Sequence, residues 1–308
     1  MKENIISCAR AELIGGVPAV VVTGVEYLDV HKTFDCGQSF RFERVENSAH
    51  ESEYSGVAFG RFVSFAQDGS TLYVYNSDLD DFANIWVPFL CLDTDYARIS
   101  ADVLSFGRGT VLERAEAHGR GIRILRQDPF EAVISFIISQ NNNIPRIKKI
   151  IESMSETYGE RIEISEALRA HASQSSSLCA FPSRERLASL SEQELRELRM
   201  GFRAGYVLDA ARKIHGGEID LAALAALGTD ECINELCKVR GIGVKVASCA
   251  ALFGMGKYDA FPIDVWIKRV AQKYFAHESE PFSAARFGEY AGIAQQYLFY
   301  YERYFGGE

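Results

Sequence analysis

The stretch from Cys237 to Val270 constrains the fold of this chain more than any other part of its sequence. Its pattern predicts a helix, a Gly-Ile-Gly hairpin, a second helix, a loop, and a third helix that begins at Asp264. Gly241 and Gly243 permit a tight turn and allow a partner to approach the backbone closely. The second helix begins with unpaired N–H groups, which form a ready site for a phosphate. The segment therefore predicts a helix-hairpin-helix unit that contacts nucleic acid.

Two residues of this segment are candidates for catalysis. Lys245 lies in the first turn of the second helix, and Asp264 follows nineteen residues later. A cation at this end of a helix opposes the macrodipole, which favours the neutral amine that a nucleophile needs. Asp264 stands at an N-cap, where a carboxylate can also stabilise a cationic transition state. On the spacing alone, an exposed lysine and a plain capping aspartate explain the pattern equally well.

Composition limits the possible classes of protein. The chain has 308 residues, enough for two or three domains, and 47% of them are hydrophobic, which suits a packed core. A net charge of −9 argues against a protein that coats nucleic acid non-specifically, although backbone amides and a local basic face can suffice for binding. No apolar run is long enough to span a bilayer, and residues 1–10 lack a signal-peptide pattern. We therefore expect an intracellular protein of the cytoplasm or nucleoid, without a membrane partner.

The cysteines carry no metal signature. Seven are scattered along the chain, and none forms a Cys-x-x-Cys pair. That pattern disfavours a zinc site, an iron–sulfur cluster and a disulfide framework. We expect reduced thiols in or near the core and no cofactor.

The chain divides into a strand-rich part and a helical part. Residues 17–77 contain β-branched runs separated by turn signals, which predicts an antiparallel sheet that is mostly a meander. From about Asp78 onward the periodicity is helical. An α+β fold follows, with the sheet at the N-terminal end.

Two helix connections carry side chains of uncertain role. Asn141 begins a run of three asparagines that suits a capped turn, but amides there, with Arg146 close by, also suit contact with a base edge. Phe202 and Arg203 stand at a helix start, where an aromatic ring and a guanidinium can stack on and bond to nucleotides. Taken alone, that pair is more often a packed ring and a solvated arginine.

Four stretches of the chain resemble one protein family, and they follow one another in the order that the family shows. Val239–Lys245 with Phe261–Val265 resembles the helix-hairpin-helix, Gly/Pro-rich loop and Asp motif of base-excision DNA glycosylases. The other stretches narrow the resemblance to the 8-oxoguanine DNA glycosylase family of the eukaryotic type, which has bacterial members. They are Cys36–Phe42, Leu125–Glu131 with Ser139–Arg146, and Met200–Tyr206. The resemblance covers nearly the whole chain.

The resemblance implies both a fold and a reaction. The fold would be an N-terminal twisted antiparallel sheet domain, residues 1–118, followed by two helical subdomains in residues 119–308, with the helix-hairpin-helix at about 231–256. The enzyme would be a bifunctional DNA glycosylase and AP lyase that flips 8-oxoguanine out of duplex DNA, preferably opposite cytosine. Lys245 would displace the base and form a Schiff base, strand cleavage by β-elimination would follow, and Asp264 would support the cationic transition state.

The same resemblance assigns the remaining site residues. The carbonyl of Gly37 would accept the N7 hydrogen that distinguishes 8-oxoguanine from guanine. The implied base pocket also contains Cys249 and Phe299, which sandwich the base, and Gln295, which contacts its pairing edge. The implied contacts to the orphaned cytosine are Asn141, Arg146 and Arg203. The implied phosphate contacts are the amides of Gly241, Gly243 and Val246. The carbonyls that can hold a structural cation in such hairpins are those of Cys237, Val239 and Ile242; the chemistry requires no metal.

Two positions depart from the family pattern. Phe202 stands where the family commonly has a tyrosine that wedges into the duplex. Trp266 stands where the animal enzymes carry a histidine that contacts phosphate. We expect weaker discrimination at these contacts, with the reaction retained.

Two other interpretations remain open at the level of sequence. An alkylpurine DNA glycosylase of the same superfamily would not use the hairpin lysine, so Lys245 argues against it. A non-catalytic helix-hairpin-helix DNA-binding protein would explain Gly241 and Gly243, but not Lys245 with Asp264. Under the favoured interpretation the partner is double-stranded DNA that contains oxidised guanine, and the protein is a monomer.

Overall fold

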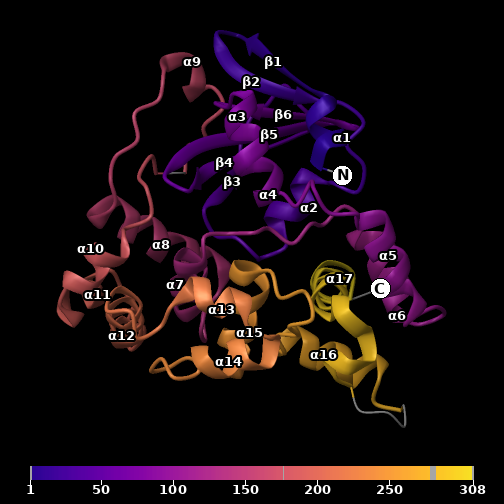
Figure 1. Ribbon diagram of the computed structural model, residues 1–308, viewed down its shortest axis with the longest axis vertical. Helices are drawn as coiled ribbons and strands as arrows, with labels where there is room; N and C mark the ends of the chain where they lie inside the picture. Colours follow the sequence, from indigo (N-terminus) through magenta and orange to yellow (C-terminus); the bar gives the residue numbers. More distant parts are fainter. Residues whose placement is uncertain (1, 176, 278–281, 307–308) are drawn as a thin grey trace.

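The computed structural model describes residues 2–175, 177–277 and 282–306. Figure 1 shows a sheet at one end of the molecule and helices at the other. The predicted α+β fold, an antiparallel sheet followed by helices, is confirmed.

In the described residues, six strands form one antiparallel sheet in the order β1-β2-β6-β5-β4-β3. The strands are β1 (Ala9–Ile14), β2 (Val17–Val22), β3 (Phe42–Arg44), β4 (Ser52–Ala58), β5 (Arg61–Asp68) and β6 (Thr71–Tyr75). Strands β3 to β6 form a meander, and β2 pairs with β6. The sheet begins earlier in the sequence than the β-branched run predicts, because β1 is the amphipathic edge strand.

Both faces of the sheet are covered, which explains why β4 and β5 are buried along almost their whole length. One face packs on α2 (Val30–Asp35) and on the segment around Trp86, with Phe34 and Phe65 in between. The other face packs against Leu168 and its neighbours. The short helices near the sheet are α1 (Lys2–Ser7), α3 (Leu79–Asp81), a π-helix (Phe82–Trp86), α4 (Val87–Phe89) and α9 (Glu166–Arg169).

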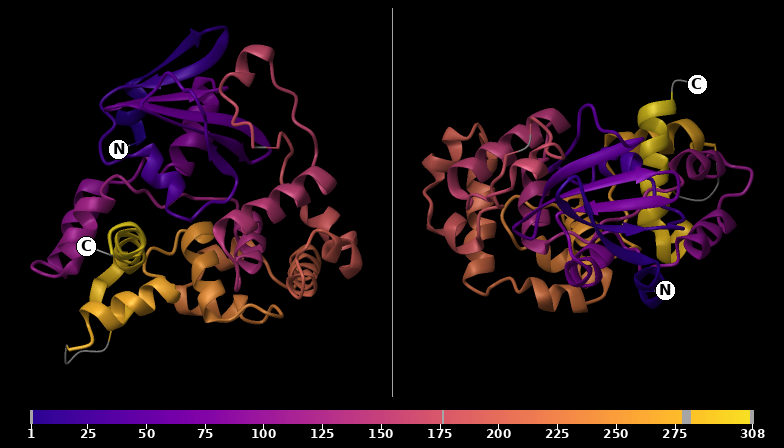
Figure 2. Two further views of the ribbon diagram at one scale, coloured as in Figure 1. Left: turned by 180° about the vertical axis from the view of Figure 1, so that it is seen from behind. Right: turned by 90° about the horizontal axis from the view of Figure 1, so that it is seen from above.

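The helices form two groups below the sheet (Figures 1 and 2). One group contains α8 (Ile144–Tyr158), α10 (Arg184–Ser189), α11 (Glu192–Glu197) and α12 (Arg203–His215). The other contains α5 (Tyr96–Ser105), α6 (Val111–Gly119), α13 (Leu221–Ala226), α14 (Thr229–Leu236), α15 (Val244–Met255), α16 (Val265–Tyr274), a 3₁₀ helix (Ala284–Tyr290) and α17 (Ala291–Phe305). Helix α7 (Pro129–Ile138) packs on both α12 and α15 and joins the two groups.

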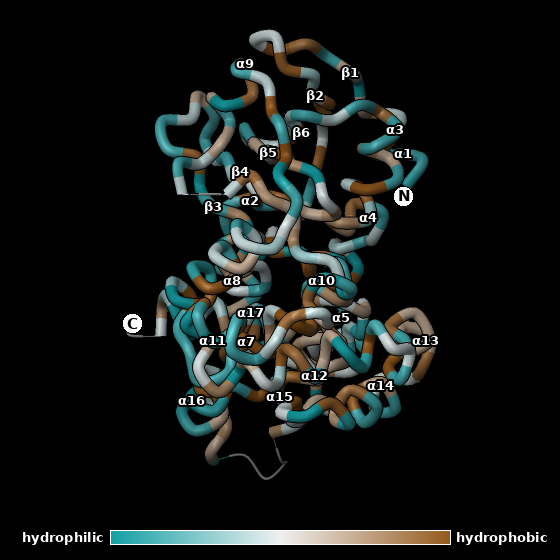
Figure 3. Tube along the Cα trace, turned by 90° about the vertical axis from the view of Figure 1, so that its left-hand side faces the viewer, coloured by the Kyte–Doolittle hydropathy of each residue, from teal (hydrophilic) through white to brown (hydrophobic). Residues whose placement is uncertain are grey.

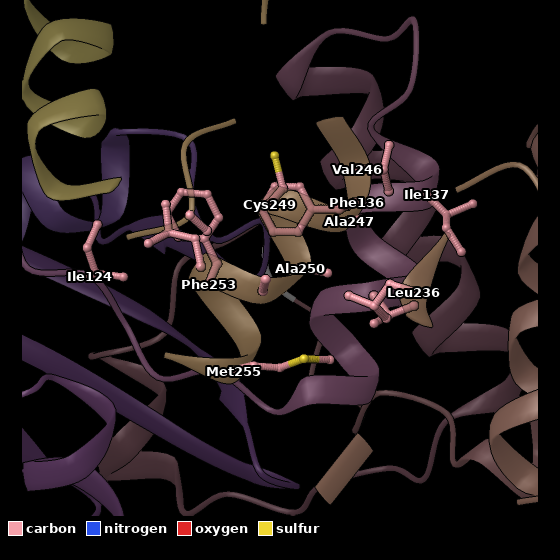
Figure 4. Packing of buried hydrophobic residues seen from close by; sticks show 14 of the residues in the cluster. Ile124, Phe136, Ile137, Leu236, Val246, Ala247, Cys249, Ala250, Phe253 and Met255 are labelled. Carbon is pink, nitrogen blue, oxygen red and sulfur yellow. The ribbon is translucent and has the colours of Figure 1, made fainter. Parts of the chain in front are cut away.

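Helices α7 and α15 form the centre of the helical core. Nearly every residue of both helices is buried, as expected for helices that are apolar on all sides. Phe136 stacks on Phe253 with ring centroids 5.3 Å apart, and Cys249 lies beside them (Figure 4). Gly254 allows the close crossing, because a Cβ at this position would lie 2.7 Å from that of Ala132. Figure 3 shows hydrophobic positions between the helices and hydrophilic positions on outer helices such as α16.

Residues with positive φ lie at two helix boundaries. The chain breaks at Gly288, whose φ of +64° is not helical, and α17 begins at Ala291. Helix α11 ends at Glu197, and Arg199 takes a φ of +62°. The helix-hairpin-helix, expected at about 231–256, begins with α14 at Thr229 and ends with α15 at Met255. The proposed domain boundary at 118–119 lies at the end of α6, which packs against α17.

Candidate active site

A cavity of about 860 Å³ lies where the helical groups meet the loop after α2. Its lining brings together most of the predicted site residues: Gly37, Asn141, Phe202, Gly243, Lys245, Val246, Cys249, Asp264, Trp266, Gln295 and Phe299. Arg146, Arg203 and Gly241 lie outside this lining. Residues from six separate segments therefore converge on one space.

The hairpin positions the start of α15. Gly241 has a φ of +80°, and a Cβ there would lie 2.2 Å from the ring of Tyr206, so only glycine fits. Gly243 is the N-cap of α15 and has open space around it. Because glycine offers no side-chain acceptor, the first-turn amides of α15 are not capped by a side chain. This arrangement suits a phosphate from a partner.

Lys245 is half-buried at the cavity and lies one helical turn before Cys249. Burial raises the pKa of the Cys249 thiol to about 11, although the charge of Lys245 opposes the shift. The thiol therefore stays neutral at physiological pH and offers an apolar surface to the cavity.

Asp264 serves as a helix cap and also faces the cavity. Its Oδ1 accepts hydrogen bonds from the backbone N–H groups of Trp266 and Ile267, each at 2.9 Å. Both bonds end on one oxygen, so the cap does not require Oδ2. Burial raises the pKa of the Asp264 carboxyl, and the cap amides and the charge of Lys245 oppose that shift. The amine of Lys245 and the carboxylate of Asp264 thus line the same cavity.

Buried hydrogen bonds fix the loop that carries Gly37. The Gln38 amide donates to the carbonyls of Thr33 (2.9 Å) and Arg123 (2.8 Å). Gln296 donates from Nε2 to the carbonyl of Cys36 at 2.8 Å. Gly37 itself has a φ of +80°, and a Cβ there would lie 3.2 Å from Ile144 Cδ1. Because glycine has no side chain, the backbone of residue 37 itself forms the surface of the cavity here.

Gln295 and Phe299 come from one face of α17. Gln295 is 4% exposed, and its Oε1 has no hydrogen-bond partner among the described residues. The ring of Trp266 stands edge-on to Phe299 with centroids 6.5 Å apart. The guanidinium carbon of the exposed Arg269 lies 4.6 Å from the centroid of the Trp266 ring. A cation therefore stands beside the tryptophan that replaces the histidine of the animal enzymes.

The residues predicted to contact the opposite strand form a second cluster. Arg203 is 3% exposed, and it donates to the carbonyls of Gln140 and Asn141 at 2.7 Å each and of Met200 at 3.2 Å. Asn141 has a φ of +46° and an exposed side chain. Burial lowers the pKa of the Arg203 guanidinium, and the nearby charge of Arg146 lowers it further. In this structure Arg203 holds the backbone of the asparagine loop and is not a solvated arginine. Its contact with the opposite base stays a prediction.

Phe202 is 49% exposed at the rim of the cavity. Its ring lies edge-on to that of Tyr206, with centroids 5.8 Å apart, and 4.5 Å from the Arg203 guanidinium carbon. The Phe202 ring is thus exposed but held in place by Tyr206 and Arg203, as a side chain that inserts into a duplex would need to be.

The predicted cation position involves backbone carbonyls of the hairpin. The Val239 carbonyl already accepts the Ile242 N–H at 3.1 Å, which uses part of its capacity. In the described ranges, no group of three or more His, Cys, Asp or Glu residues could hold a metal ion. The carbonyl site at Cys237, Val239 and Ile242 stays a prediction.

Sequence reasoning missed two residues of α17, Gln296 and Arg303. Gln296 anchors the Gly37 loop, and Arg303 lines the cavity. Arg303 follows Phe299 by one helical turn, as Phe299 follows Gln295, so the helical spacing could have identified it.

Two family patterns match the chain in succession. The N-terminal domain of 8-oxoguanine DNA glycosylase matches residues 20–133, and the HhH-GPD superfamily of base excision DNA repair proteins matches residues 134–286.

Relatives match most of the chain. An N-glycosylase/DNA lyase of Arabidopsis thaliana is 30% identical over 297 residues, which cover 87% of this chain and 75% of the relative. The solved 8-oxoguanine glycosylase/lyase of Clostridium acetobutylicum, in complex with double-stranded DNA containing cytosine opposite 8-oxoG, is 38% identical. It superposes with a TM-score of 0.85 and covers 96% of this chain and 97% of its own.

A 3-methyladenine DNA glycosylase from Archaeoglobus fulgidus also superposes, with a TM-score of 0.67, over 92% of this chain and 98% of its own. At 19% identity this likeness shows a shared fold alone. In the part of the chain that the structure describes, no helix is long and apolar enough to cross a membrane.

Proposed function

We propose that this chain, which belongs to the 8-oxoguanine DNA glycosylase family of helix-hairpin-helix base-excision repair proteins, excises 8-oxoguanine from duplex DNA and then cleaves the strand. One observation carries the proposal: Lys245 and Asp264 line the same cavity as Gly37, Cys249 and Phe299. A non-catalytic DNA-binding module has no use for a half-buried carboxylate and an amine that line one cavity.

The location of the cavity requires that the base leave the helix stack. The glycosidic carbon of a stacked nucleotide is out of reach of a half-buried lysine, so the nucleotide must be extruded. The exposed ring of Phe202 at the rim would fill the vacated space. The amides of Gly241 and Gly243 in the hairpin and of Val246 in the first turn of α15 would hold a phosphate near the extruded nucleotide.

In the chemical step, the lone pair of Lys245 Nζ attacks C1′ of the extruded nucleotide. The glycosidic bond breaks, the base leaves with the bonding pair, and it takes up a proton that the attacking amine loses. The C1′–O4′ bond then opens, O4′ takes up a proton, and a protonated Schiff base with Lys245 forms; loss of a C2′ proton expels the 3′ phosphate by β-elimination. The Asp264 carboxylate stabilises the positive charge that develops on the sugar.

Recognition of the base divides among three walls of the cavity. The Gly37 carbonyl would accept the N7 hydrogen of 8-oxoguanine, and Gln295 would contact the pairing edge. The neutral Cys249 thiol and the Phe299 ring would enclose the two faces of the base, and the raised pKa of the thiol supports that role.

Opposite the lesion, cytosine is the base that the Clostridium complex contains. We propose that Asn141, Arg146 and Arg203 favour cytosine here, and that Phe202 and Trp266 make the preference less strict. The enzyme would act on chromosomal DNA in the cytoplasm or nucleoid, as a monomer and without an iron–sulfur cluster.

Single-turnover base release tests this function. Duplexes that carry 8-oxoguanine opposite cytosine, 8-oxoguanine opposite adenine, or an alkylated adenine should be compared. We expect excision of 8-oxoguanine, fastest opposite cytosine, and its loss in Lys245→Gln. Among the residues that the structure describes, the exposed Lys238 pairs with Glu235 alone, so Lys238→Gln is the matched control and should keep full activity. Release of the alkylated adenine alone would contradict the proposal.

A further inference from the structure

Helix α17 presents three side chains to the cavity: Gln295, Phe299 and Arg303. Their spacing of four residues places them on one face of the helix, with the first and last about 12 Å apart along the axis. The aromatic ring thus lies between two polar side chains.

Each of the two polar side chains has a buried atom without a hydrogen-bond partner in the described residues. On Gln295 this atom is Oε1, an acceptor, and on Arg303 it is Nη1, a donor. Buried polar groups are rarely left unpaired, because each such group costs free energy. Two unpaired atoms of opposite polarity on either side of one ring indicate a ligand with a donor at one end and an acceptor at the other.

Arg303 adjoins the wall that carries Gly37. Its Nη1 would lie 3.6 Å from a Cβ placed on Gly37, and Phe299 Cε1 would lie 3.7 Å from the same point. The nearby carboxylates are engaged elsewhere, since Asp35 accepts a hydrogen bond from Tyr304 at 2.5 Å and Glu302 accepts one from Tyr274 at 3.1 Å. The Arg303 guanidinium lies over the ring of Tyr304, 4.8 Å from its centroid, and its Nη1 is a donor beside Gly37 without a partner in the described residues.

We infer that Arg303 donates a hydrogen bond from Nη1 to the O8 carbonyl of the extruded base. This inference rests on the proposed function, in which the Gly37 carbonyl accepts the N7 hydrogen. O8 is bonded to the carbon next to N7, so a donor beside Gly37 is in reach of it. Gln295 then meets the donors of the pairing edge at the opposite end of the purine. Nη1 is covered in this structure, so the contact requires that the entering base displace a neighbouring side chain.

This contact adds a second criterion for the lesion. Guanine has a C–H group at position 8, so its entry would leave the Arg303 N–H unpaired in a site closed to water. Charge-assisted hydrogen bonds of this kind change affinity by about 10- to 100-fold. Gly37 and Arg303 together would detect both atoms that oxidation changes.

Equilibrium binding in the Lys245→Gln background tests the assignment, because that background stops the reaction. Affinities should be measured for one duplex with 8-oxoguanine and an identical duplex with guanine, both opposite cytosine. We expect Arg303→Met to weaken binding of the 8-oxoguanine duplex by about 10- to 100-fold and to change binding of the guanine duplex by less than about twofold. Arg303→Lys, which keeps a donor, should recover part of the loss.

Lys149→Met is the matched control, because this exposed lysine lines the neighbouring cavity that Arg303 also borders. It should change neither affinity by more than about twofold. An equal loss on both duplexes with Arg303→Met would make the residue a phosphate contact, and no loss would make it part of the wall; either result overturns the inference. If the wild-type enzyme does not excise 8-oxoguanine at all, the proposed function fails first, and base release shows this separately.

Discussion

The side chain of Gln296 donates a 2.8 Å hydrogen bond to the backbone carbonyl of Cys36, and both residues are buried. This bond joins the last helix to the loop after α2, two segments at opposite ends of the sequence. It fixes the backbone next to Gly37, so the position of the pocket wall depends on a residue that does not itself need to touch the base.

Gln296→Leu should therefore reduce both stability and excision. Removal of the donor leaves a buried carbonyl unpaired, which costs about 1–3 kcal/mol of unfolding free energy. Urea denaturation and single-turnover excision measure the two effects. Gln295→Leu is the neighbouring control: Oε1 of Gln295 has no partner to lose, so stability should hold while binding of 8-oxoguanine DNA falls. Equal destabilisation by both substitutions would contradict the anchoring role of Gln296.

Two substitutions of Asp264 separate its role as a helix cap from its role in catalysis. Asn keeps an acceptor at the N-cap but carries no charge, whereas Ala removes both. Asp264→Asn should lose excision with little change in stability, and Asp264→Ala should also lose about 0.5–2 kcal/mol of unfolding free energy. Retained excision in Asp264→Asn would show that the charge is not needed.

The same carboxyl predicts a pH dependence. Because burial raises the pKa of Asp264, it becomes protonated, and excision is lost, at a higher pH than for a free aspartate. The sign for stability is the opposite of the usual one: a raised folded-state pKa means that ionisation costs stability once the pH exceeds the ordinary value. Asp264→Asn should thus be at least as stable as wild type at neutral pH.

Glu131 lies in the first turn of α7, away from the cavity lining. Burial raises the pKa of its carboxyl to about 7, although the charge of Arg41 opposes the shift. Stability should fall as the pH rises from the ordinary carboxyl range to about 7 and then level off. Glu131→Gln should therefore stabilise the protein by about 1–3 kcal/mol near pH 8 and by much less near pH 4. Urea denaturation at both pH values measures this; the exposed Glu163, changed to Gln, should show no such difference.

Arg203→Ala should erode the preference for cytosine over adenine opposite the lesion. Its guanidinium holds the carbonyls of Gln140 and Asn141, so its loss releases the asparagine loop. Arg212 is a suitable control, because it lies on the same helix and also donates to backbone carbonyls, those of Ala188 and Leu190. Excision rates opposite each base are the measurement. A uniform loss on all opposing bases would make Arg203 a general structural residue.

Local patterns in the sequence predicted much of this structure. The cap at Asp264 and the hairpin glycines depend on residues close in sequence, and both are present. The family, the fold and the activity followed from four short motifs in order.

The features that sequence did not predict depend on contacts between distant segments. Arg203 is buried because the loop at Gln140 folds over it, and no local pattern around Arg203 indicates that loop. The bond from Gln296 to Cys36 and the approach of Arg303 to Gly37 have the same character. The break at Gly288 was missed because a single glycine does not by itself interrupt a helical pattern.

Trapping with borohydride tests the central claim most directly. The protein is incubated with duplex DNA that carries 8-oxoguanine opposite cytosine, borohydride is added, and the attachment site is identified by mass spectrometry of the digested adduct. A Schiff base on Lys245 predicts a covalent DNA adduct on the peptide that contains Lys245, and no adduct in Lys245→Gln. An adduct on another residue, or excision without any trapped complex, would contradict the account.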